Sequence, residues 1–187
     1  MQPTVTVSQG GAVTEAAMKT ALAMLRKSQV YVGIPETTAM DRKRQLMSLA
    51  SSAPSKRKSR LQGLAVSGGV NNAQLVYIHT HGSPLKRIPA RPIIEPAIND
   101  PENKAKITDE LGLAAKAGLD GRPNDVTKYL NLSGQLAENL VRAWFVNPKN
   151  HWAPNAASTV RRKKSDKPLI DTGAMRKAIT YVVSEEI

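Results

Sequence analysis

PLIDTGAMRKAITYVV, residues 168–183, is the stretch of sequence that decides how the fold closes. Its first three residues are expected to be extended, because proline and the residue before it disfavour helix. The side-chain oxygens of Asp171 and Thr172 can cap a helix of one or two turns that begins near Gly173. From Ala178 onward apolar and polar residues alternate, which is typical of a half-buried strand. The stretch therefore predicts a capped turn that leads a strand into a sheet.

Two further strands are predicted outward from this one. Residues 29–34 (QVYVGI) alternate strongly and end before Pro35, whereas residues 3–8 alternate weakly. Together with residues 178–184 these segments can share one small, mainly antiparallel sheet. The expected fold class is therefore α+β.

Two long helices are predicted to flank this sheet. Residues 12–28 and 125–146 each carry an apolar stripe at helical spacing, and Asn124 or Asp125 can cap the second helix. Residues 103–118 are also helical in composition. Packed on one sheet, these elements predict a single domain over residues 1–187.

A shorter helix is expected over residues 73–81. Asn71 or Asn72 can cap its start, and Gly82 stands where a helix often ends with positive φ. The proline-rich segment that follows forces extended chain, and another helix can begin near Pro92.

Residues 36–70 are interpreted as an extended basic arm inserted within the domain. A brief helix over residues 42–49 is interrupted at Pro54, and the basic sequence KRKSR follows. Residues 61–70 can form the return arm of a long hairpin. We expect a flexible loop or hairpin arm that is ordered only by a partner.

Basic residues are concentrated in two runs. The chain has 27 Lys and Arg against 15 Asp and Glu, a net charge of +12. Residues 41–60 carry seven basic residues and one acid, and residues 161–167 carry five and one. Such runs either contact a polyanion or remain solvated. The candidate contacts with DNA or a protein partner are Arg42, Lys43, Arg44, Lys56, Arg57, Lys58, Arg60, Arg161, Arg162, Lys163 and Lys164.

The chain lacks the motifs of the common classes of enzyme. It has no cysteine, no phosphate loop and no nucleophile elbow. His79 and His81 form the only histidine cluster, and on a helix their side chains diverge without a third ligand nearby. We expect no enzymatic activity, no metal and no cofactor. Neither a signal peptide nor a membrane span is expected, because no segment reaches about 18 apolar residues.

Two segments resemble a known family of virion proteins. Residues 71–98, NNAQLVYIHTHGSPLKRIPARPIIEPAI, resemble the pattern N-A-x-x-A-x-x-H-E-x-G followed by I-P-A-R-P-F. Residues 151–183, HWAPNAASTVRRKKSDKPLIDTGAMRKAITYVV, resemble W-x-P-L-x-x-x-T, a basic run and P-L-I-D-T-G-x-L-R-x-S-I-x-Y-x-V. Both patterns occur in this order in the tail-completion or neck proteins of long-tailed bacteriophages and in related virion-morphogenesis proteins of Mu-like phages. Departures are His81 for an aromatic residue, Thr80 for the acid and Ile93 for Phe.

The resemblance implies a structural virion protein that forms an oligomeric ring, commonly sixfold, at the head–tail junction. Its partners would be neighbouring neck, tail-terminator or connector proteins, with non-specific contact to genomic DNA in the lumen and none to a membrane. It would be located in the virion, and in the host cytoplasm during assembly. The alternative is a phage or prophage DNA-binding accessory protein without a virion role.

Five residues are expected to maintain these motifs or to contact another subunit. Arg91 is a candidate for an ion pair with a carboxylate, either within the chain or across subunits. The others are Trp152 as an aromatic anchor, Asp171 and Thr172 as a helix cap, and Gly173 as the residue that allows a sharp turn into the helix.

Overall fold

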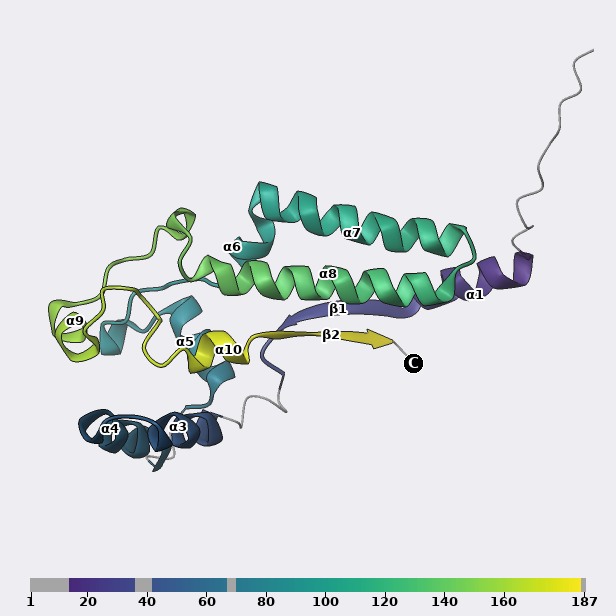
Figure 1. Cartoon of the computed structure of the whole chain (residues 1–187). Helices are drawn as coiled ribbons and strands as arrows, with labels where there is room; N and C mark the ends of the chain where they lie inside the picture. Colours follow the sequence, from purple (N-terminus) through teal and green to yellow (C-terminus); the bar gives the residue numbers. More distant parts are fainter. Residues whose placement is uncertain (1–13, 36–41, 67–69, 186–187) are drawn as a thin grey trace, which may run out of the picture.

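The computed structural model describes residues 14–35, 42–66 and 70–185 and has the α+β class that the sequence predicts. The long helices and the sheet run along an elongated molecule, and the shorter helices gather at one end, to the left in Figure 1. The strands are β1 (Ser28–Gly33) and β2 (Thr180–Glu185). The helices of the described residues are α1 (Glu15–Lys27), α3 (Arg42–Ser51), α4 (Ser55–Val66), α5 (Asn72–His81), α6 (Ile94–Asn99), α7 (Pro101–Leu119), α8 (Pro123–Trp144), α9 (Ala157–Lys163) and α10 (Ala174–Ala178), with short 3-10 turns η1 (Pro84–Lys86) and η2 (Pro148–Asn150).

The sheet pairs β1 with β2 in antiparallel register, and α8 covers one of its faces. Val32 lies opposite Tyr181 on the face toward the helices, as the alternation predicts. Tyr31 lies opposite Val182 on the other face, where they are 53% and 44% exposed. The strand predicted over residues 3–8 lies outside the described residues. The two strands predicted at residues 29–34 and 178–184 are confirmed to within two residues.

The core consists of two apolar clusters placed along α8. One lies between α1, α7, α8 and the far end of the sheet and contains Ala21, Ala114, Ala117, Val126 and Leu130. The other lies at the end of α8 nearest the short helices and contains Val76, Ile93, Ala97, Val141, Trp144, Phe145, Met175 and Ile179. The second cluster draws on both segments that carry the family resemblance, so the packing joins them.

The long helices begin and end close to where they were expected. Thr14 caps α1 by accepting from the Ala17 amide, and α1 packs against α7 and α8. The predicted caps of α8 are wrong, because the helix begins at Pro123 and no side chain caps it. Proline suits the first helical position, whose N–H would have no helical partner. Asp125 instead lies in the first turn and pairs with Arg122 at 2.5 Å.

Tyr181 of β2 approaches α8 at a glycine. A Cβ atom on Gly134 would lie 2.8 Å from Cγ of the Tyr181 ring, closer than side chains tolerate. The absence of a side chain at Gly134 therefore sets the distance between the sheet and α8.

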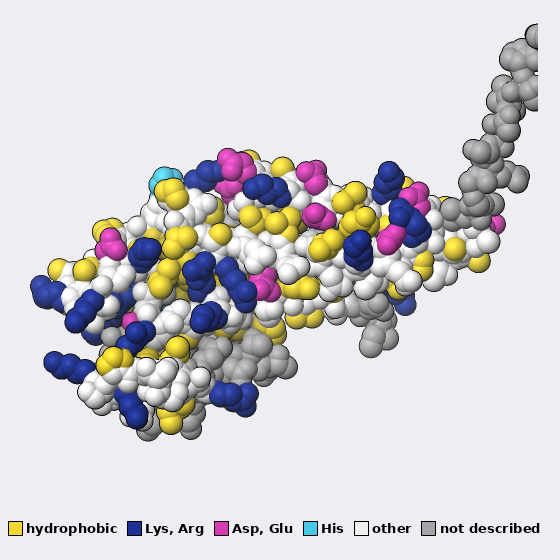
Figure 2. Space-filling model, viewed as in Figure 1, with side chains coloured by type: hydrophobic (Ala, Val, Ile, Leu, Met, Phe, Trp, Pro, Cys, Tyr) yellow, Lys and Arg dark blue, Asp and Glu magenta, His cyan; other side chains and the backbone are white. Residues whose placement is uncertain are grey.

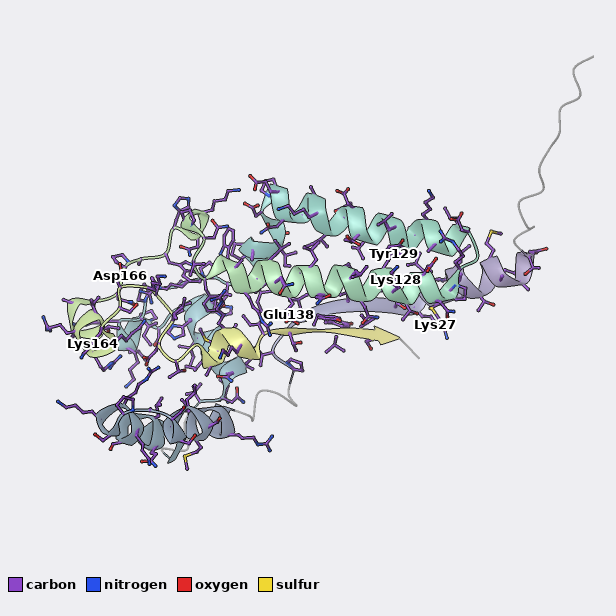
Figure 3. The ribbon with its side chains drawn as sticks, in the orientation of Figure 1. Lys27, Lys128, Tyr129, Glu138, Lys164 and Asp166 are labelled. Atoms are coloured by element: carbon purple, nitrogen blue, oxygen red, sulfur yellow. The ribbon has the colours of Figure 1, made fainter. Side chains whose placement is uncertain are left out.

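A polar network fixes the start of β2 on the same helix. Glu138 pairs with Arg142 at 2.5 Å and accepts from the Thr180 hydroxyl at 3.0 Å. Arg142 also donates to the carbonyl of Ile179 at 2.6 Å from Nη2. Glu138 is labelled on α8 in Figure 3, beside the first residues of β2.

Residues 42–66 form a helical hairpin. The brief helix expected over residues 42–49 is confirmed as α3, whereas the extended or flexible chain expected for the rest of the segment is wrong. Leu46 and Ala50 of α3 face Leu61 and Ala65 of α4, and all four side chains are buried. Residues four apart lie on one side of a helix, so these pairs make a continuous seam. The hairpin that the sequence suggested is thus present, but both arms are helical. No helix among the described residues has the length and apolar character to cross a bilayer.

Candidate functional site

The turn after α5 folds back residues 71–98, which with residues 151–183 are the two motif segments that carry the family resemblance. Asn71 and Gln74 form a reciprocal capping box at the start of α5, as expected of Asn71. Gly82 ends the helix with φ of 76°, and a side chain there would meet the backbone of Ala90 at 2.8 Å. An isolated bridge between Ser83 and Ile88 then closes the turn. The chain is thereby directed past α5 toward Arg91.

Arg91 joins the two motif segments through backbone carbonyl groups. Only 6% of the residue is exposed. Its Nε and Nη2 donate to the Ala153 carbonyl at 3.0 and 2.8 Å, and Nη2 also donates to the Pro154 carbonyl at 3.0 Å. Its own amide donates to the His79 carbonyl at 2.6 Å. The ion pair expected within the chain is therefore wrong for the described residues, because carbonyl oxygens occupy the donors; a contact across subunits stays a prediction.

Trp152 makes a second link between the same segments. Its indole nitrogen donates to the Pro92 carbonyl at 3.0 Å. Its ring meets Phe145 edge-on, with 5.7 Å between ring centres, and packs on the core. The aromatic anchor predicted at this position is confirmed.

The turn before α10 matches the prediction at Thr172 and Gly173. Gly173 is the N-cap residue with φ of 78°, a left-handed conformation that glycine adopts without strain. The Thr172 hydroxyl accepts from the Ala174 amide at 3.2 Å. The N-cap position is Gly173 and not Asp171, and the hydrogen bond to the first helical amide comes from Thr172, as predicted for that residue. Asp171 is instead exposed and lines a cavity.

This cavity has a volume of about 890 Å³ and lies where the two motif segments meet. Its walls come from α5, the turn after it, α9 and the start of α10, and Leu46 of the helical hairpin reaches it. Among the described residues, its lining has one carboxylate, from Asp171, and five basic residues, which are Lys86, Arg87, Arg91, Arg162 and Lys163. Apolar side chains including Leu75, Ile88, Leu169 and Met175 complete the lining. The cavity is therefore both cationic and partly apolar.

His79 faces the cavity from α5. Its Nδ1 is buried and has no hydrogen-bond partner among the described residues. Burial lowers the pKa of His79, and the charges of Arg91 and Lys163 lower this pKa further. The ring is therefore neutral at pH 7.

The two histidines of the cluster diverge, as predicted. The exposed His81 stacks on Tyr77, with 4.2 Å between ring centres, and its Nδ1 is 2.9 Å from the Tyr77 carbonyl oxygen. His79 lines the cavity instead. Within the described parts of the chain, no group of three His, Cys, Asp or Glu side chains is placed to hold a metal ion.

The two basic runs lie at the same end of the molecule. Figure 2 shows Lys and Arg side chains gathered over the end formed by α3, α4 and α9. Arg44, Lys56, Arg57 and Lys58 are exposed on the hairpin, whereas the side chains of Arg42, Lys43 and Arg60 lie outside the described ones. Arg161 and Lys164 are exposed on and beside α9; Lys164 is labelled with Asp166 in Figure 3. Arg162 and Lys163 line the cavity.

Most lining residues were not among the sequence-based candidates, and Leu46, Lys86 and Arg87 are examples. Lys86 and Arg87 belong to the turn LKRIPARP, within the first resemblance segment but outside the two dense basic runs. Leu46 falls in the brief helix expected over residues 42–49, but it was not assigned to a buried face. The four-residue spacing of Leu46 and Ala50 was the one signal that could have identified the buried face of its helix.

Comparisons with known proteins give no match: no family model, curated protein or solved structure matches the chain. Its function is therefore argued from the cavity, the distribution of charge and the two segments that meet there.

Proposed function

We propose that the chain is a structural virion protein of a long-tailed bacteriophage. It would form an oligomeric ring at the head–tail junction and complete the tail or join it to the head. The observation that carries the proposal is that residues 71–98 and 151–183 fold into one unit. Arg91 of the first segment donates to the backbone of the second segment, and Trp152 of the second segment donates to the backbone of the first. Because these hydrogen bonds and the shared apolar cluster hold the two segments together, we treat them as one substructure.

The distribution of charge fits a protein that contacts polyanions or acidic neighbours at one end. Both basic runs lie at the end formed by α3, α4 and α9 (Figure 2). The described side chains of these runs include no aromatic residue on which a base could stack. Contact with DNA in a lumen would therefore be made to phosphates, without reading sequence.

The cavity is assigned a binding role and no catalytic one. His79 is half-buried, burial and nearby cations lower its pKa, and the carboxylate of Asp171 is exposed. The partners that fit the proposal are neighbouring neck, tail-terminator or connector proteins and genomic DNA.

Electron microscopy of particles made without the protein tests the proposal. A stop codon is placed in its gene in the phage or prophage that encodes it, and the gene is supplied in trans as the control. We expect unattached heads and tails, which the supplied gene rescues. Normal infectious particles without the protein would contradict the proposal. Salt-dependent binding of the isolated monomer to free DNA, with no protein in purified virions, would favour the accessory role instead.

A further inference from the structure

The cavity combines two kinds of lining that together select a particular class of ligand. Lys86, Arg87, Arg162 and Lys163 supply positive charge, while Ile88, Met175 and their apolar neighbours supply a surface that gains from contact with aliphatic groups. Arg91 donates to carbonyl groups, and Lys163 Nζ donates to the Lys167 carbonyl at 2.7 Å, so what these residues contribute to binding is their positive charge. A ligand with carboxylates next to an aliphatic side chain matches both parts of the lining.

Nucleic acid matches this lining less well. A volume of about 890 Å³ is that of a site enclosing a small molecule or a few side chains, so a DNA duplex cannot enter. Single strands bind to aromatic platforms among cations, and none of the described residues that line the cavity is Phe, Tyr or Trp. The lining therefore favours an acidic peptide segment over DNA.

Residues 185–187 of this same chain have the required sequence, Glu-Glu-Ile. They cannot reach the cavity of their own molecule. The start of α10 lines the cavity, and β2 then runs away from it toward α1 (Figure 1). Six strand residues cover about 20 Å, and two residues more span only about 7 Å.

We propose that residues 185–187 of one copy dock in the cavity of a second copy. The inference rests on the proposed function, because it specifies how the subunits of a ring associate. The two surfaces lie at opposite ends of β2, so the contact is head-to-tail. Such a contact generates a ring when its rotation closes and a filament when it does not.

Charge reversal on each side of the contact tests the inference. One variant, Glu185→Lys with Glu186→Lys, reverses the segment; another, Lys86→Glu with Arg162→Glu, reverses the cavity. Each alone places like charges together, and we expect its self-association to fall at least ~10-fold. In an equimolar mixture of the two variants, alternating copies place opposite charges at every contact. We therefore expect association to return to near the wild-type level.

Analytical ultracentrifugation of the full-length chains over a concentration series measures these equilibria. Lys104→Glu with Lys106→Glu on the exposed face of α7 makes the same charge change away from the cavity and should associate like wild type. Rescue in the mixture also shows that both variants are folded. A monomeric wild type, unchanged association of either single-sided variant, or no rescue would overturn the inference. None of these results bears on whether the protein is present in the virion, which is the test of the proposed function.

Discussion

Arg91 acts at the scale of one residue as a connection between segments about 60 positions apart. Replacing it by alanine removes three hydrogen bonds from a charged donor and leaves the carbonyls of Ala153 and Pro154 without that partner. We expect Arg91→Ala to lower the free energy of unfolding by about 2–4 kcal/mol, as measured by urea denaturation.

Arg87→Ala is the matched control, because Arg87 lines the same cavity but is exposed. Its effect should stay within about 0.5 kcal/mol. Arg91→Lys should recover little of the loss, since an ammonium group cannot reproduce the forked donors. Equal stability of Arg91→Ala and wild type would show that the link is dispensable.

His79 makes stability depend on pH in a definite direction. Its pKa is lowered in the folded chain, so the unfolded chain takes up the proton first as the pH falls. Stability is therefore lost progressively from about pH 7, through the ordinary histidine value near 6.5, down to the lowered pKa. His79→Gln should flatten the dependence of the melting temperature on pH in this window.

The exposed His81 provides the control for that experiment. His81→Gln should leave the slope of melting temperature against pH unchanged. Slopes that are the same for wild type and His79→Gln would contradict the assignment of His79 as a buried, neutral ring.

The contact of β2 with α8 makes a prediction at the scale of elements. Gly134→Ala should lower stability by about 1–3 kcal/mol, because the added carbon displaces the Tyr181 ring. Gly112→Ala on α7 should raise stability by up to about 1 kcal/mol, since nothing lies within 4 Å of the new carbon and alanine favours helix. The melting temperatures of the two variants should therefore shift in opposite directions. An increase for Gly134→Ala would contradict the close approach of Tyr181 to Gly134.

The helical hairpin has its own apolar seam, separate from the two clusters along α8. Replacing residues 42–66 by a short Gly-Ser linker should therefore leave the α7–α8–sheet body folded. Removing only residues 42–58 should be worse, because Leu61 and Ala65 lose the partners that bury them. Circular dichroism and light scattering compare the two: we expect a cooperative melt for the full excision and aggregation for the partial one. The reverse result would show that α3 and α4 do not depend on each other.

The sequence predicted those elements well in which regularly spaced apolar residues continue along the element and pack against the core. The stripes of α1 and α8 and the alternation around Val32 and Tyr181 each face one large neighbour, so their spacing reports their burial. The second helix of the hairpin and the seam between its arms were not recognised, because only Leu46, Ala50, Leu61 and Ala65 form that seam, among serines and basic residues. Its packing is local, so the pattern extends for barely two turns in each helix.

The candidate site was predicted less completely than the fold. Arg162 and Asp171 were identified in the sequence, but the cavity between them depends on the turn after α5 and on backbone carbonyls of residues 153 and 154. Carbonyl acceptors are present at every residue, so no sequence pattern marks the two that receive Arg91. For this reason the sequence favoured a carboxylate partner.

At the scale of the whole molecule, charge and shape are both distributed unevenly. The exposed cations of the two runs lie at the end formed by α3, α4 and α9, and the two long helices extend away from it (Figures 1 and 2). In a ring, this arrangement would place the basic ends of all subunits on one circle. Such a circle would attract a polyanion in a salt-dependent manner.

Cryo-electron microscopy of the virion in which we propose that the chain is assembled tests the central claim most directly. The account predicts a ring of density at the head–tail junction into which the α7–α8 pair, the sheet and the cavity end fit as one subunit, with basic ends facing DNA or an acidic neighbour. Virions whose junction contains no density for this chain, and whose protein content lacks it, would contradict the account.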